Sequence, residues 1–201
     1  MTESTSTTGI VLAGGRSTRF GDADKLGADL AGRPLFHHAV LALVTLCDEI
    51  VVVIAADGDV PPLPDDAGAP VRVARDRVAG LGPLAGLVAG LESTAAELVL
   101  VAGGDQPRLT RPLLALLTGS IGAADAAVLA EHGRPRPIPA ALRRSAAMAA
   151  ARARLTSDQR SLRALIADLA PVVVPERTWR QVDPDGLWRR DVDRPEDLAR
   201  A

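Results

Sequence analysis

The sequence predicts an α/β protein with one mostly parallel sheet and helices on both faces. Short β-branched runs alternate along the chain with longer segments whose apolar residues recur at helical spacing. Such alternation is typical of βαβ units, whose crossover helices cover both faces of a sheet. The chain has 201 residues, of which 47% are hydrophobic, so we expect one domain with a sizeable core. The polar N-terminus, residues 1–7, is expected to be disordered.

The strands are recognised by apolar, β-branched runs that end at turn residues. The first run stops at Gly14-Gly15 and is short enough for a buried strand. A loop rich in Pro, Gly and Asp follows the second run and indicates a surface connection. Strands are expected at 8–13, 49–56, 71–74, 97–103, 125–131 and, as a short one, within 171–176.

The helices are recognised by their termini as well as by their spacing. Proline lies in the first turn of two of them, and Thr110 is the expected N-cap of a third helix that Gly119 would end. Asp158 is the expected N-cap of a later helix, and Asp193 that of a short final one. Besides the helix after Thr110 and the final one, the helical segments are 34–46, 82–93, 143–155 and 157–169.

Composition excludes several classes of partner. The formal net charge is −2, aromatic residues make up 2% of the chain and tyrosine is absent, so neither nucleic acid nor an acidic membrane surface is an expected partner. No segment approaches 18 uninterrupted apolar residues, and the N-terminus lacks the charge and apolar pattern of a signal peptide. We therefore expect a cytoplasmic protein whose single cysteine, Cys47, is a core thiol.

The loop after the first strand is the richest in candidate chemistry. Gly14 and Gly15 are followed by Arg16, Arg19 and Lys25. Ligands of open α/β sheets bind beyond the carboxyl ends of the strands, where glycines let backbone N–H groups approach phosphate oxygens. The spacing fits neither the dinucleotide fingerprint nor the Walker A loop. Two interpretations stand, a phosphate-binding loop and a flexible loop with solvated charges.

Lysine usage favours the first interpretation. Lys25 is the only lysine, and the other 22 basic residues are arginines. Lysine offers a compact charge on a flexible stem, which suits a phosphate whose geometry changes during reaction.

Four segments, in order, resemble the molybdenum cofactor guanylyltransferases. The first is "LAGGRSTRFGDADK", similar to that family's L-A-G-G-x-x-x-R-M-G-x-x-x-K signature. The others are "RDRVAGLGPLAGLVAGL", "VAGGDQPRLT" and "DVDRPEDL". The resemblance spans nearly the whole chain and implies a single Rossmann-like three-layer domain of the nucleotidyltransferase type. It also implies GTP and molybdopterin as substrates, Mg²⁺ as cofactor and transient contact with cofactor-biosynthesis or molybdoenzyme-maturation proteins.

The resemblance further implies roles for particular residues. Lys25, Arg19 and Asp105 would be catalytic, and Asp105 and Asp193 would bind metal. The residues implied in nucleotide binding are Leu12, Ala13, Gly14, Gly15, Arg16, Lys25, Asp76, Pro83 and Asp105.

Each acidic assignment has a plainer alternative. Asp105 follows a strand and precedes "QP", so it also fits a turn. Asp193 fits a helix cap, and Asp76 fits a solvated partner of Arg75 or Arg77.

Two arginines, and three departures from the family's sequence pattern, bear on which base and which acceptor the protein uses. Arg134 and Arg136, in "EHGRPRP", either meet the acceptor's phosphate or belong to a solvated loop. Phe20 replaces the family's methionine, "IA" replaces an asparagine near the end of the second strand, and Arg194 replaces a threonine. Cytidylyl transfer, transfer to another small phosphate, and a non-catalytic nucleotide-binding module therefore stay open as alternatives to guanylyl transfer.

Overall fold

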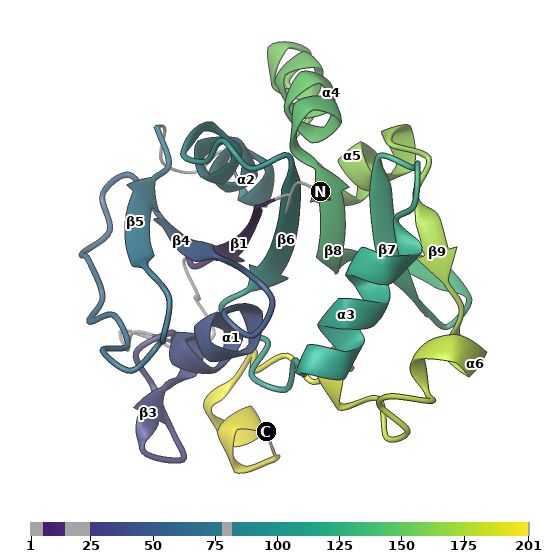
Figure 1. Ribbon diagram of the computed structural model, residues 1–201. Helices are drawn as coiled ribbons and strands as arrows, with labels where there is room; N and C mark the ends of the chain where they lie inside the picture. Colours follow the sequence, from purple (N-terminus) through teal and green to yellow (C-terminus); the bar gives the residue numbers. More distant parts are fainter. Residues whose placement is uncertain (1–5, 15–24, 78–81, 201) are drawn as a thin grey trace.

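The predicted fold class is confirmed by the structure, a computed structural model that describes residues 6–14, 25–77 and 82–200. One sheet takes seven strands in the order β5-β4-β1-β6-β8-β7-β9 (Figure 1). β8 is antiparallel to both of its neighbours, and the other pairings in this sheet are parallel. The strands are β1 (Thr7–Leu12), β4 (Glu49–Ile54), β5 (Val71–Arg75), β6 (Leu98–Gly103), β7 (Ala126–Glu131), β8 (Arg134–Arg143) and β9 (Val172–Val174). A small hairpin of β2 (Asp29–Leu30) and β3 (Arg33–Pro34) stands apart from the sheet.

Helices cover both faces of the sheet, which makes the predicted three layers. α1 and α3 lie on one side, and α2, α4 and α5 lie on the other (Figure 1). The helices are α1 (Leu35–Leu43), α2 (Pro83–Glu92), α3 (Arg111–Ser120), α4 (Arg144–Thr156), α5 (Leu162–Asp168) and α6 (Glu176–Trp179). Two 3₁₀ turns, η2 (Leu187–Arg189) and η3 (Pro195–Arg200), lie near the C-terminus.

β1 lies inside the sheet and contributes to both cores. Ile10 and Val11 are fully buried, yet Ile10 packs with the core beneath α2 and Val11 with the core beneath α1. Successive side chains of a strand point to opposite faces, so a strand buried on both sides is apolar throughout. Because β1, β4, β5 and β6 are parallel, their carboxyl ends meet at one edge of the sheet.

β8 is the strand of the seven-stranded sheet that the sequence does not predict. Pro135, Pro137 and Pro139 lie in its first part, and proline has no N–H for a ladder. The ladder with β6 runs only over the proline-free residues 140–143. The hairpin that joins β7 to β8 turns at His132 and Gly133, which have positive φ angles of 50° and 73°. That geometry suits a tight two-residue hairpin.

Several predicted boundaries need correction. Gly119 lies inside α3, which begins after Thr110 as predicted but has Ile121 as its C-cap. The N-cap of α5 is Ser161, not Asp158; its hydroxyl accepts a hydrogen bond from the Ala164 N–H at 3.2 Å. The final helix is the 3₁₀ turn η3.

The predicted disorder over residues 1–7 reaches too far into the chain. Thr7 is the first residue of β1, and its N–H donates to Asp48 Oδ2 at 2.8 Å. Residues 1–5 lie outside the described part.

None of the helices in the described part of the chain combines the length and apolarity that crossing a bilayer requires.

Candidate functional site

The chain leaves β1 through a tight passage beside the end of β4. The Ala13 N–H donates to the Val53 carbonyl at 2.8 Å and extends the pairing of the two strands. A Cβ on Gly14 would lie 2.9 Å from the backbone nitrogen of Ala55, which is too close, so the position requires glycine. The three other predicted loop residues, Gly15, Arg16 and Arg19, lie outside the described residues.

Lys25 connects the two carboxylates that the sequence predicts as metal ligands. Its Nζ lies 2.9 Å from Asp105 Oδ2 and 3.1 Å from Asp193 Oδ1. The three residues come from the turn before β2, the end of β6 and the segment before η3, so only the fold brings them together. The Lys25 side chain is 12% exposed, whereas that of Asp193 is 54% exposed. The cluster therefore opens to solvent on the side of Asp193.

The ammonium of Lys25 is held in its charged form. Burial lowers its pKa, but hydrogen bonds and charge from Asp105 and Asp193 outweigh that effect and raise the pKa above its usual value. Lys25 therefore carries a full positive charge at neutral pH.

The turn after β6 places the carboxylate of Asp105. A Cβ on Gly103 would lie 2.5 Å from Asp105 Oδ1. The carboxylate therefore occupies the space that the side chain of any residue other than glycine at position 103 would need. The Gly104 N–H donates to the Leu12 carbonyl at 3.0 Å, and the Val192 N–H donates to the Asp105 carbonyl at 3.0 Å. Asp105 is thus tied to the end of β1 and to the C-terminal segment.

A second polar cluster beside Asp105 is not predicted by the sequence. Gln106 is 1% exposed; its Oε1 accepts from the Gly103 N–H at 2.9 Å, and its Nε2 donates to Asp191 Oδ1 at 3.4 Å. Asp191 forms an ion pair with Arg136, which also donates to Glu131 Oε2 at 2.9 Å. Arg136 therefore has two carboxylate partners.

Asp191 belongs to the same group of charges as the first cluster. Burial raises its pKa to about 6; Arg136 opposes that shift, and the charges of Asp105 and Asp193 add to it. The sequence signal was the D-V-D spacing, in which Asp191 and Asp193 flank Val192, a residue that is fully buried.

The remaining predicted residues lie along the same edge of the sheet. The Asp76 N–H donates to the Ile54 carbonyl at 2.9 Å, so Asp76 follows β5 beside the end of β4. Pro83 is the exposed first residue of α2. The plainer alternative for Asp76 named Arg75 and Arg77. Arg77 pairs with Glu92 at 2.8 Å and Arg75 donates to a backbone carbonyl, and the role of Asp76 stays a prediction.

The predicted core thiol is buried, and the two histidines of α1 lie against backbone carbonyl groups. Cys47 is 6% exposed, and burial together with Asp48 raises the pKa of its thiol to about 12. His37 and His38 contact backbone carbonyl oxygens at 2.6 and 2.9 Å.

A glycine turn and a carboxylate at the ends of adjacent parallel strands are the arrangement typical of Rossmann-like α/β proteins that bind nucleotides. The MobA-like NTP transferase domain matches residues 9–172. The chain belongs to the MobA-like NTP transferase family, and it is thereby a nucleotidyltransferase.

Two curated relatives are similar to this chain over nearly its full length. The probable molybdenum cofactor guanylyltransferase of Natronomonas pharaonis is 32% identical over 201 residues, which cover 96% of each chain. The molybdenum cofactor guanylyltransferase of Burkholderia vietnamiensis is 38% identical over 92% of this chain and 93% of the relative.

Solved structures share the fold. Molybdopterin-guanine dinucleotide biosynthesis protein A from Archaeoglobus fulgidus has a TM-score of 0.74 at 22% identity, over 96% of this chain and 95% of that one. The 2-C-methyl-D-erythritol 4-phosphate cytidylyltransferase of Thermus thermophilus has a TM-score of 0.69 at 18% identity, with the same coverage.

Proposed function

We propose that this protein transfers GMP from GTP to the terminal phosphate of molybdopterin. An oxygen of that phosphate forms a bond to the α-phosphorus of GTP, the bond to the β-phosphate breaks and pyrophosphate leaves. The observation that carries the proposal is the contact of Lys25 with both Asp105 and Asp193 at the carboxyl edge of the sheet. The relatives' names, at 32% and 38% identity, supply the substrates.

The protein's task in such a displacement is positioning and charge neutralisation. The backbone of Leu12, Ala13 and Gly14 lies where the nucleotide's phosphates would meet the end of β1. In the proposed reaction the Lys25 ammonium stabilises the charge that develops at the α-phosphate. Arg16 and Arg19 are proposed to face the β- and γ-phosphates, and their placement stays a prediction.

Asp105 and Asp193 fit the proposed Mg²⁺ ion. Their carboxylates converge on one cation, the Lys25 ammonium, so the geometry already suits a positive charge between them. Among the described residues no group of three or more Asp, Glu, His or Cys side chains forms a complete metal cage. Mg²⁺ is commonly held by one or two carboxylates plus substrate phosphates, so two ligands suffice. When bound, the ion would neutralise charge on the phosphate oxygens.

Asp76 and Pro83 are the proposed contacts to the nucleoside. Asp76 lies beside the end of β4, where its carboxylate can accept hydrogen bonds from guanine N1–H and N2–H₂ or from ribose hydroxyls. Ile54 and Ala55 supply no side-chain amide there, and this observation keeps cytidylyl transfer as the second candidate function.

Thermal shift with the four nucleoside triphosphates and Mg²⁺ tests the base. A ligand at 100 times its Kd stabilises a protein by about 2.7 kcal/mol, which is readily measured. We expect GTP to raise the Tm more than ATP, CTP or UTP. A larger shift with CTP would assign the protein to cytidylyl transfer. The cytoplasmic location and the transient protein contacts stay predictions.

A further inference from the structure

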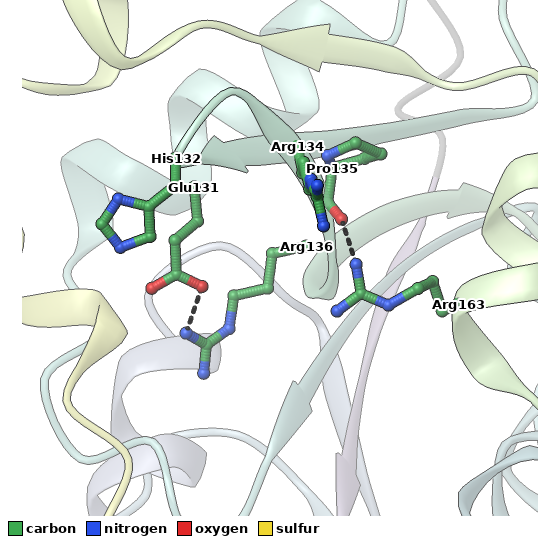
Figure 2. Close-up of a pocket in the computed structure, with 6 residues that line it drawn as sticks. All are labelled: Glu131, His132, Arg134, Pro135, Arg136 and Arg163. Atoms are coloured by element: carbon green, nitrogen blue, oxygen red, sulfur yellow. Dashed lines mark hydrogen bonds and ion pairs between the residues drawn. The ribbon is translucent and has the colours of Figure 1, made fainter.

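A basic pocket lies at the turn between β7 and β8. It has a volume of about 560 Å³ and is formed by the hairpin and by one residue of α5 (Figure 2). Its lining residues are Glu131, His132, Arg134, Pro135, Arg136 and Arg163. Pockets for small organic ligands typically measure about 300–1,000 Å³, so the size suits a substrate.

The strand register places the pocket beside Asp105. Val101 of β6 is opposite Ala140 of the antiparallel β8, and a Cβ on Gly103 would lie 3.4 Å from Ile138 Cδ1. Residues of β8 before 138 therefore extend past the end of β6, on the side where Asp105 lies. Two contacts agree with this placement. Arg136 pairs with Asp191, and the N–H of Val192, the residue after Asp191, donates to the Asp105 carbonyl.

The sheet order separates this pocket from the proposed nucleotide site. Gly14 and Asp76 lie at the ends of β1 and β5, whereas the pocket lies at β8 and β7. β6, which is followed by the turn that carries Asp105, is between these two sides. In-line transfer brings the attacking and leaving oxygens to opposite sides of the reacting phosphorus. If the pyrophosphate leaves on the side of β1, an acceptor above β8 and β7 lies on the side from which its oxygen attacks.

The charges of the pocket favour an anion. Arg136 is balanced by Glu131 and Asp191, and Figure 2 shows its guanidinium directed at Glu131. Within the described part of the chain, Arg134 and Arg163 form no ion pair, and the Arg163 guanidinium makes one hydrogen bond, to the Pro135 carbonyl at 3.4 Å (Figure 2). Two guanidinium groups therefore remain for a ligand, and their planar donors suit oxyanions and flat heterocycles.

We propose that this pocket binds the body of the acceptor substrate, and that Arg134 and Arg163 hold an anionic group of it other than the phosphate that reacts. The inference rests on the proposed function, because it assigns the acceptor of that reaction. The acceptor is then an organic phosphate with a second anionic centre. The two arginines act on acceptor binding, while Lys25 and Asp105 serve the transfer.

The test compares Arg134→Ala and Arg163→Ala with a matched control in steady-state transfer from GTP to molybdopterin. Arg152→Ala is the control, because Arg152 is an exposed arginine that pairs with Glu92 and lines no part of the pocket. We expect each pocket variant to raise KM for molybdopterin roughly tenfold, the effect of one lost charged hydrogen bond, with KM for GTP at the wild-type value. Arg134→Lys keeps the charge, so its KM for molybdopterin should lie between the values of the wild type and Arg134→Ala. Melting temperatures show that each variant is folded.

Direct binding of molybdopterin and of GTP to the wild type and the variants tests the pocket assignment separately from the proposed guanylyl transfer. Weaker binding of molybdopterin, and not of GTP, in the two pocket variants alone supports the assignment. Wild-type transfer with an unchanged molybdopterin KM in both variants overturns the pocket and leaves the function intact. A wild type that binds GTP but neither binds nor modifies molybdopterin overturns the proposed function, and the pocket assignment falls with it.

Discussion

At the scale of single residues, the site depends on where one ammonium group lies. Lys25 Nζ is within 3.1 Å of two carboxylates whose residues are 80 and 168 positions away in the chain. Without the Lys25 ammonium, the two carboxylates would repel each other across the place where the triphosphate is proposed to bind. The lysine therefore holds the cluster together before any ligand arrives.

Lys25→Arg tests whether a compact charge is needed. The charge is kept, so GTP binding should weaken little, but a planar fork cannot place one charge between Asp105 and Asp193 as an ammonium does. We expect kcat to fall on the order of tenfold to a thousandfold with a smaller change in KM for GTP, the pattern of an interaction made mainly in the transition state. Steady-state transfer by the purified variant measures this. An unchanged kcat would show that the single lysine has no special role.

Asp105→Asn tests the proposed metal ligand. The side chain is 30% exposed, and the change removes a charge without removing core volume, so the Tm should change little. Transfer should be lost even in saturating Mg²⁺. Asp66→Asn is a suitable control, because it removes the same charge from a surface pair with Arg33. Near wild-type turnover by Asp105→Asn would refute the metal assignment.

At the scale of elements, the turn after β6 and the prolines of β8 shape the site. The turn gives Asp105 its space beside Gly103, and the proline-containing part of β8 leaves the ladder with β6 and continues beyond it. That extension carries the pocket residues past the end of β6. Interrupted pairing is therefore a means of placing side chains at the carboxyl edge.

Gly103→Ala should impair the site more than the fold. The added methyl would meet Asp105 Oδ1 at 2.5 Å, and a carboxylate can turn away more readily than a backbone can move. We expect a large loss of kcat with a small change in Tm, measured by transfer assays and thermal unfolding.

Gly119→Ala is the matched control for that substitution. Gly119 lies within α3 and has open space around its Cβ position. Alanine there should stabilise the fold by about 0.5–1 kcal/mol and leave transfer unchanged. Equal effects of the two substitutions on kcat would contradict the role of Gly103.

At the scale of the whole molecule, two cores enclose a sheet whose central strands are buried on both faces. Cys47 belongs to the core beneath α1, together with Phe36 and both tryptophans, Trp179 and Trp188. The C-terminal segment that carries Asp193 is thus anchored in the same core as the first helix. Loss of that core should loosen the site and expose the thiol together.

The thiol of Cys47 reports this global unfolding. With its pKa raised to about 12, on the order of one thiol in 10⁴ is ionised at pH 8, and the thiolate is the reactive form. We expect a thiol reagent to modify the native protein slowly and the urea-unfolded protein at once. Modification of the native protein at the rate of a free cysteine would contradict the burial of this residue.

The sequence by itself determined the layers, the parallel strands β1, β4, β5 and β6 and the position of Asp105 after a strand, because these depend on local periodicity and on turn residues. It also contained, in four ordered motifs, the family to which the chain belongs. It did not predict β8, whose prolines oppose a strand locally although pairing with β6 and β7 outweighs that preference. Nor did it predict the ion pair of Asp191 with Arg136, or the single lysine between two aspartates, because contacts between residues so far apart in the chain exist only once the sheet has formed.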